Sequence, residues 1–291
     1  VEQIPVFLSR ITALEFQEGK FKEAMDLCIA FLRSLGIKLP RSNLRIMAST
    51  IGIILSLKRV SKSISTKNLD QLPLATNEVT TGTMLVLDKL IGLSIMAASP
   101  MFPILAFRAM KMTLRDGITN SSPPAFAQLG LLTFAILGDI QGSAVWADRA
   151  LLLMNRLPNP ESCKSRTLFL TSFFVLPWSQ PLNSMIKPLL SAYQVGLASG
   201  DIESAVYSIG TYVTIAIMAG RPLEGLLDDC RVYFGQMKQL GRERLYVNCN
   251  IQWQMIANLM GRAEDHLTLT GEAMDQDEIM VKSLDPTFES N

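Results

Sequence analysis

The amino-acid sequence predicts an all-α fold assembled from antiparallel pairs of helices, and three observations favour it. Apolar residues recur at helical spacing in one segment after another, and the β-branched run at residues 212–217 lies inside a helix-length segment without flanking turn residues. A glycine followed by a polar residue separates several neighbouring segments. Charged residues make up only 18% of the chain and the mean hydropathy is +0.26, as expected where helices are buried on most sides.

Residues 114–157 contain the clearest helix pair. Gly138 ends a predicted helix at residues 124–137, because glycine takes the left-handed conformation at no steric cost. Asp139 then caps a second helix, residues 140–157, by accepting hydrogen bonds from free amides of its first turn. Small residues lie along one face of that helix, so we expect Ala144 where the two backbones cross closely. Such a pair needs neighbours of the same kind to bury its apolar face.

Two more turns follow the same pattern. Gly19 precedes a helix that carries Ala24, and Gly200 with Asp201 precedes a helix that carries Ala205. We expect each alanine to face the preceding helix. The helix pairs on either side of these turns are predicted at residues 2–18 with 21–35, and at residues 182–199 with the segment that reaches residue 219.

The other elements complete an all-helical chain. Residues 65–76 form a polar connector, Ser99-Pro100 breaks a helix, and residues 158–160 form a loop. We expect one helical array over residues 1–263, and a weakly ordered helix with a tail over residues 264–291, where acidic residues accumulate. Because the chain begins inside an apparent helix, we expect it to be part of a longer protein. The remaining predicted helices are residues 43–63, 77–98, 102–116, 161–175, 223–240 and 243–260.

Charge and cysteine content narrow the function classes. The chain has 291 residues, with 27 basic and 26 acidic ones, so no strong field favours nucleic acid. The basic run at residues 58–62 is typical of a solvated helix face. Four widely spaced cysteines predict neither a zinc site nor a disulfide framework, and we expect buried thiols and a cytoplasmic location. They are Cys28, Cys163, Cys230 and Cys249.

A polytopic membrane protein is the alternative interpretation. Residues 90–107, 117–138 and 167–186 carry no formal charge, and their lengths approach the ~20 apolar residues that a bilayer span requires. However, prolines and clustered polar residues interrupt each run. We therefore expect helices buried in a soluble array, with no membrane span.

The motifs of common catalytic sites are absent from the sequence. Gly19-Lys20 lacks the upstream glycine and the hydroxyl residue of a phosphate-binding loop. His266 is the sole histidine and lies in an acidic stretch, and Asp228-Asp229 fit the polar face of a helix. We expect no catalytic residue, no cofactor and no metal site. An enzyme with a site in its helical core remains a third interpretation, with the fewest observations behind it.

The glycine turns resemble those of tetratricopeptide-type repeats, and a wider resemblance covers most of the chain. The matching blocks are Glu18–Ala24, Leu35–Pro40, Leu72-Pro73 with Thr76, Leu114-Arg115 with Gly117, Ser122, Ala125–Ala127 with Gly130, Gly138-Asp139, Ala150-Leu151, Trp178 with Pro181-Leu182, Ala192-Tyr193 and Gly196–Asp201. In the order and spacing of these blocks, the chain is similar to the helical region that follows the AAA-type ATPase core in multidomain signalling proteins, which also carry Ser/Thr-kinase-like, GAF and histidine-kinase domains. Its Pro123-Pro124 departs from the family pattern, so the helix there is expected to start later.

The resemblance implies a right-handed, tetratricopeptide-like solenoid that serves as a regulatory and protein-interaction segment of an ATPase or kinase. The motifs of those catalytic domains lie outside this chain, so no catalytic residue is carried over. Partners would be a protein or the neighbouring domains of the same chain, with a small-molecule effector as a further option.

The loop at residues 177–181 is the best single interaction candidate. Two prolines stiffen it, which lowers the entropy cost of ordering it on binding. Trp178 offers a large apolar contact with one hydrogen-bond donor, and Gln180 stands beside it. The competing interpretation is that Trp178 fills a gap between the helices on either side.

Overall fold

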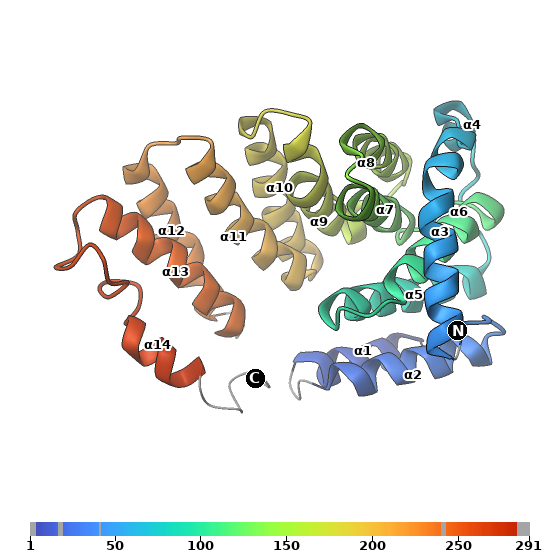
Figure 1. The fold of residues 1–291 in the computed structure, drawn as a ribbon, viewed down its shortest axis with the longest axis horizontal. Coiled ribbons are helices and arrows are strands. Elements are labelled where there is room, and N and C mark those ends of the chain that lie inside the picture. Colours follow the sequence, from blue (N-terminus) through green and yellow to red (C-terminus); the bar gives the residue numbers. More distant parts are fainter. Residues whose placement is uncertain (1–3, 17–19, 41, 240–242, 284–291) are drawn as a thin grey trace. The chain divides into compact units, whose positions relative to one another are not determined.

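A computed structural model describes residues 4–16, 20–40, 42–239 and 243–283, and within these ranges the chain is helical with no β-strand. The predicted all-α fold is therefore confirmed (Figure 1). Two compact units divide the chain: unit 1, Val1–Ser179, and unit 2, Gln180–Asn291. The predicted boundary between the helical array, residues 1–263, and the weakly ordered segment, residues 264–291, falls inside unit 2.

Unit 1 is built on a run of successively packed helices. Helix α5 packs on α2 and α6, α7 packs on α6 and α8, and α9 packs on α7 and α8. Helix α3 lies across α6, α7 and α8 (Figure 1). The elements are α1 (Ile4–Phe16), α2 (Phe21–Ser34), α3 (Asn43–Ser63), α4 (Thr66–Asp70), α5 (Glu78–Met96), α6 (Phe102–Asp116), α7 (Ser122–Leu137), α8 (Ile140–Asn155), α9 (Glu161–Leu170), a π-helix η1 (Thr171–Val175) and a 3₁₀-helix η2 (Leu176–Trp178).

The pair of α7 and α8 forms as the sequence predicts. Gly138 has a φ of 63°, and the Asp139 carboxylate accepts a hydrogen bond of 2.8 Å from the amide of Gly142. The two backbones approach closely at Gly130, where an added Cβ would lie 3.1 Å from the Ser143 carbonyl oxygen. The crossing on α8 is thus at Ser143, one residue before Ala144, which is only half-buried.

Helix α7 begins earlier than predicted. It starts at Ser122 rather than at residue 124, and Pro123 and Pro124 occupy its first turn. Amides of the first turn have no partner inside a helix, so proline there removes no hydrogen bond. The Ser122 hydroxyl also accepts a hydrogen bond from the Thr119 amide at 3.0 Å.

The polar connector at residues 65–76 is more structured than its composition indicates. It contains α4, and the backbone around Leu74 pairs with that around Ile118 in an isolated parallel bridge. The Ile118 amide donates to the Pro73 carbonyl and the Ala75 amide donates to the Ile118 carbonyl, both at 2.9 Å. A side chain at Gly117, with φ +102°, would place its Cβ 2.7 Å from that Pro73 oxygen. Glycine is therefore required where these two segments meet.

The predicted helix at residues 161–175 changes its winding near its end. It is α-helical to Leu170 and then widens into the π-helix η1 before Pro177. In a continuous α-helix the ring of Pro177 would clash with the carbonyl four residues earlier. The wider turn accommodates the proline, and the 3₁₀-helix η2 follows.

Unit 2 consists of helices that pack in order along the chain. Helix α11 packs on α10, α12 and α13, and α12 packs on α13. Between α13 and α14, Asn258 and Gln254 hold the loop through hydrogen bonds to its backbone, including 2.6 Å to the Thr268 carbonyl. The tail predicted after Ser283 lies outside the described residues. The elements are α10 (Asn183–Ser199), α11 (Ile202–Met218), α12 (Leu223–Gln239), α13 (Glu243–Leu259) and α14 (Gln276–Ser283).

Candidate functional site

Cysteine and histidine side chains are the first to consider as catalytic or metal-binding groups. All four cysteines are free and buried. Burial raises the pKa of the Cys163, Cys230 and Cys249 thiols to about 12, so each remains a protonated, weakly nucleophilic thiol at neutral pH. Within the described parts of the chain, no group of three or more metal-binding side chains comes together. His266 is exposed.

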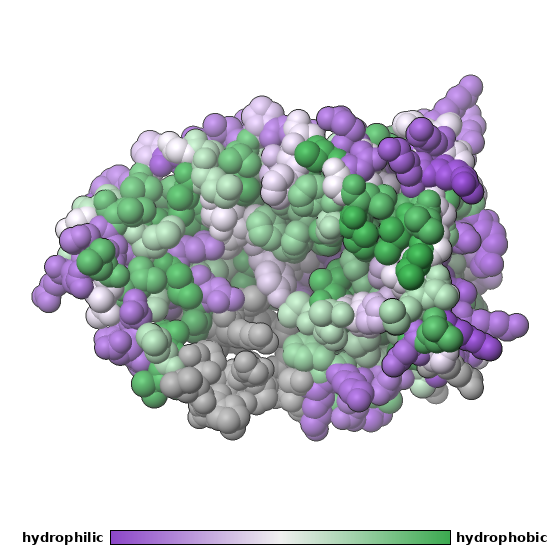
Figure 2. All heavy atoms as spheres, viewed as in Figure 1, coloured by the Kyte–Doolittle hydropathy of each residue, from purple (hydrophilic) through white to green (hydrophobic). Residues whose placement is uncertain are grey.

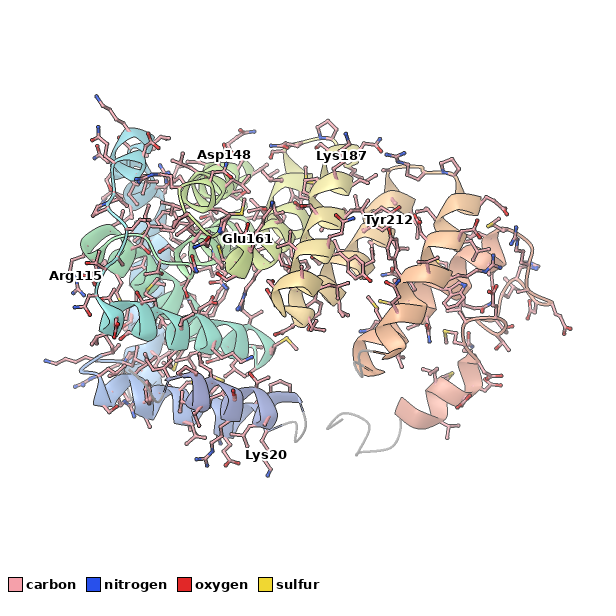
Figure 3. The ribbon with its side chains drawn as sticks, turned by 180° about the vertical axis from the view of Figure 1, so that it is seen from behind. Lys20, Arg115, Asp148, Glu161, Lys187 and Tyr212 are labelled. Atoms are coloured by element: carbon pink, nitrogen blue, oxygen red, sulfur yellow. The ribbon has the colours of Figure 1, made fainter. Side chains whose placement is uncertain are left out.

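The adjacent carboxylates on α12 serve different partners. Asp229 accepts a hydrogen bond of 2.5 Å from the Tyr212 hydroxyl, which projects from α11 toward α12 (Figure 3). Asp228 pairs with Arg231 at 3.1 Å. Burial of Tyr212, followed by its bond to Asp229, raises the pKa of that phenol. The geometry links two helices and does not aim two carboxylates at one reacting centre.

The glycine turns predicted from sequence are helix ends and caps. Gly200 has a φ of +82°, and Asp201 accepts a hydrogen bond of 3.2 Å from the Ser204 amide. Ala24 and Ala205 are fully buried. Gly19 lies outside the described residues. Among the described residues, Gly138 and Gly200 therefore end helices, and Asp139 and Asp201 cap the helices that follow.

Trp178 lies at the surface of unit 1. It is 55% exposed, and its ring stacks on Phe134 with centroids 4.5 Å apart. Trp178 therefore covers Phe134 at the surface and does not fill an interior gap. Gln180 is exposed, and unit 1 ends one residue before it. The two predicted interaction residues thus belong to different compact units.

A row of exposed apolar side chains on α3 is the most unusual surface of unit 1, and sequence analysis did not identify it. Its spacing of three, four and four residues places all members on one helix face. Each is more than half exposed, although Leu57 and Ile46 on the opposite side of α3 are buried. We call this set the outer row: Leu44, Met47, Ile51 and Leu55.

The outer row continues toward the turn between α7 and α8. Lys58, one turn after Leu55, lies 3.9 Å from Asp139 in that turn. The turn exposes three further apolar side chains, Ile136, Leu137 and Ile140. Figure 2 shows hydrophobic side chains gathered on the side of the molecule where α3 lies. Contiguous apolar patches of this kind mark interaction surfaces in soluble proteins.

Two arginines, one in α8 and one directly after it, fix the position of α3 and α4. Arg149 is 6% exposed and donates to the carbonyl oxygens of Ser61 at 2.8 Å and Ile64 at 2.6 Å. Arg156 donates to the carbonyls of Leu69 and Leu72 at 2.9 and 2.8 Å. Each guanidinium satisfies carbonyls at a helix C-terminus, where positive charge is also favoured by the helix dipole. The surface formed by α3 is therefore held in a defined place on unit 1.

A second feature lies on the side of α3 that faces α6. A groove of about 610 Å³ is lined by four basic side chains, Lys38, Arg108, Lys111 and Arg115. Arg115 lies on the outer side of α6 (Figure 3) and pairs with Asp116 at 2.6 Å. None of the described residues that line this basic groove is acidic. Desolvation, followed by the charge of Arg115, lowers the pKa of Arg108.

Among the described residues, α5 is the one helix long and apolar enough to cross a bilayer by length and composition, and half of its most apolar stretch is buried inside the protein. A core helix of a soluble protein has the same character, so this finding is weak support for a membrane protein.

Comparisons with models of protein families, with curated proteins and with solved structures give no match to this chain.

Proposed function

We propose that the chain is a non-catalytic, regulatory and protein-interaction segment of a larger cytoplasmic signalling protein, in which it follows an ATPase core. Its helix pairs would stack as a tetratricopeptide-like, right-handed solenoid. The observation that carries the proposal is the outer row, because four large apolar side chains on one helix face remain in water. Burying such side chains contributes roughly 1.5–3 kcal/mol each, which is available to a partner.

The places in the fold of the residues that carry the resemblance to the signalling family support the proposal. The blocks around Pro73 and Gly117 are far apart in sequence, yet they meet in the bridge between Leu74 and Ile118. The block around Gly130 lies at the crossing of α7 and α8. Residues that carry the resemblance thus hold this helical scaffold together.

Charge indicates the chemistry of the partner. Helix α3 carries four basic residues and no acidic one, and three of them, Lys58, Arg59 and Lys62, follow the outer row. We propose that the partner is an amphipathic helix of a neighbouring domain of the same protein, with acidic residues flanking its apolar face. Such a helix would lay its apolar face on the outer row and its carboxylates on the basic end of α3. Its binding to one state of the ATPase and not the other would shift the equilibrium between them.

Matched substitutions in the intact protein test the proposal. Ile51 in α3 and Val232 in α12 are both helical and both 55% exposed. Ile51→Gln should weaken attachment of the neighbouring domain about ten-fold or more, because it places a polar group in the apolar contact. The rate of ATP hydrolysis by the intact Ile51→Gln protein should also change, because attachment of the neighbouring domain is proposed to bias the ATPase between its states. Val232→Gln should leave the rate unchanged.

Two further outcomes would count against the proposal. Equal effects of both substitutions would show that the outer row has no special role. Binding of the chain to vesicles of anionic lipid, abolished by Ile51→Gln, would assign the outer row to a membrane surface. In either case the chain alone should neither bind nor hydrolyse ATP, and calorimetry with ATP checks this directly.

A further inference from the structure

We propose that the basic groove between α3 and α6 binds an amphipathic anion, an alkyl chain that ends in a carboxylate or phosphate. The groove is separate from the outer row, since the two lie on different sides of α3. The proposal gives a ligand class to the effector of the regulatory function above, but binding by the isolated chain can be measured whether or not that function holds.

The size and floor of the groove fit an alkyl chain. Its volume of about 610 Å³ falls in the range of roughly 300–1,000 Å³ that small-molecule sites occupy. Ile104, Phe107 and Met112 of α6 line it and are largely buried, and the half-buried Ile53 of α3 contributes from the other side. These apolar groups would remove an alkyl chain from water.

Three of the four positive charges that line the groove have no acidic partner among the described residues, whereas Arg115 pairs with Asp116. Lys38, Arg108 and Lys111 pair with no carboxylate among the described residues. Arg108 donates to the Lys38 carbonyl at 2.9 Å, which orients its guanidinium, and the Lys111 ammonium lies 4.8 Å from the centre of the Phe107 ring. Oriented cations above an apolar floor are the arrangement that an amphipathic anion needs.

Crowding of like charges strengthens the assignment. Arg108 is half-buried, and both its burial and the nearby charge of Arg115 lower its pKa, which means that its charged form is disfavoured where it stands. A bound anion would offset this repulsion. An α-helix with its side chains is about 10–12 Å across, so a volume of about 610 Å³ would enclose only about one of its turns. A small molecule therefore fits better than an acidic helical peptide.

Occupancy of the groove can influence the outer row. Helix α3 supplies Ser49 and Ile53 to the groove and Ile51 and Leu55 to the outer row. A ligand that packs against the inner side of α3 would therefore favour the position of α3 to which it binds more tightly, and the outer row would move with the helix.

Decanoate, decyl phosphate and the uncharged 1-decanol are the probes, titrated into the chain by calorimetry and by NMR of methionine methyl groups. We expect both anions to bind and 1-decanol to bind at least ten-fold more weakly. The relative affinities of decanoate and decyl phosphate show whether the groove prefers a carboxylate or a phosphate headgroup. Met112 lines the groove and Met47 belongs to the outer row, so the Met112 methyl signal should shift strongly and any shift of the Met47 signal should be smaller.

A pair of matched variants locates the head. Lys111→Gln removes one exposed cation of the groove, and Lys62→Gln removes one exposed cation of α3 that does not line it. Lys111→Gln should weaken decanoate binding roughly ten- to one-hundred-fold, the value of a charged hydrogen bond, and Lys62→Gln should leave it unchanged. Equal binding of 1-decanol, a shift at Met47 in place of Met112, equal losses in both variants, or binding of polyglutamate without decanoate would each overturn the proposal.

Discussion

Replacing Arg149 by methionine tests whether α8 holds α3 in place. Methionine keeps much of the apolar volume but removes every donor. The guanidinium makes three hydrogen bonds, to the Ser61 hydroxyl at 3.1 Å and to the Ser61 and Ile64 carbonyls. It also lies 4.9 Å from the Trp146 ring centre. Arg149→Met therefore leaves carbonyls at the end of α3 without their donor.

The size of the effect follows from opposing contributions. Each buried carbonyl left unpaired costs about 1–3 kcal/mol, and the lost contact with the Trp146 ring adds about 0.5–1 kcal/mol. Against this, burial disfavours the charged form of Arg149 and lowers its pKa, so removing the charge returns part of the loss. We expect the free energy of unfolding to fall by about 2–4 kcal/mol.

Urea unfolding and amide hydrogen exchange are the assays. Exchange should accelerate in the last turn of α3 and in α4, and stay slow at the crossing of α7 and α8. Arg115→Met is the control: Arg115 is exposed and, among the residues that the structure describes, its ion-pair partner is Asp116, so this change should alter neither measurement. An Arg149→Met protein with wild-type stability and exchange would refute this reasoning.

The remaining predictions concern glycine, thiols and Trp178. Gly130→Ala should destabilise the chain, because its Cβ would press on the Ser143 carbonyl, whereas Gly225→Ala, with open space around it, should raise melting stability by up to about 1 kcal/mol. Trp178→Ala should cost clearly less on thermal melting than the ~3–5 kcal/mol of a buried tryptophan, because 55% of the side chain is already exposed and the loss is that of its partial burial and its stack on Phe134. Ellman's reagent should leave the buried thiols of the folded chain unmodified at neutral pH. Because burial raises the pKa of Cys163, Cys230 and Cys249 from 9.0 to about 12, the free energy of unfolding should fall as the pH rises above about 9. Thiols that react equally fast in the folded and the urea-unfolded chain would contradict their burial.

Local signals made the helices and their ends predictable. Gly138 with Asp139 and Gly200 with Asp201 act within one turn of the chain, so their left-handed backbone and capping bonds need no knowledge of the rest of the fold. The bounds of α3 and α6 also match the predicted ranges. The start of α7 was predicted two residues too late, because Pro123 and Pro124 lie in its first turn, where proline is tolerated.

Features that depend on contacts between distant segments could not be predicted. The rotation of α8 decides whether Ser143 or Ala144 meets α7, and one residue corresponds to about 100° of rotation in a helix of 3.6 residues per turn. The docking of the connector rests on backbone bonds between Pro73 and Ile118. The burial of Arg149 rests on carbonyls more than 80 residues earlier, and its sequence neighbourhood gives no sign of it.

The sequence of α3 contains a pattern that indicates the outer row. Helix α3 is apolar on two sides, one with Ile46, Ile53 and Leu57, the other with the outer row. A helix that is apolar all round is normally buried, so composition alone indicated a core helix. The basic residues at its end are the one clue that it lies at the surface.

Photo-crosslinking from the outer row tests directly whether this surface binds a helix of a neighbouring domain. A benzoylphenylalanine at position 51 of the intact protein, with one at position 232 as control, would be activated and its products mapped by mass spectrometry. The account predicts crosslinks from position 51 to an acidic amphipathic helix in a neighbouring domain of the same protein, weakened by Lys58→Glu, and none from position 232. Crosslinks from position 51 to lipid alone, or none to any domain of the protein, would contradict it.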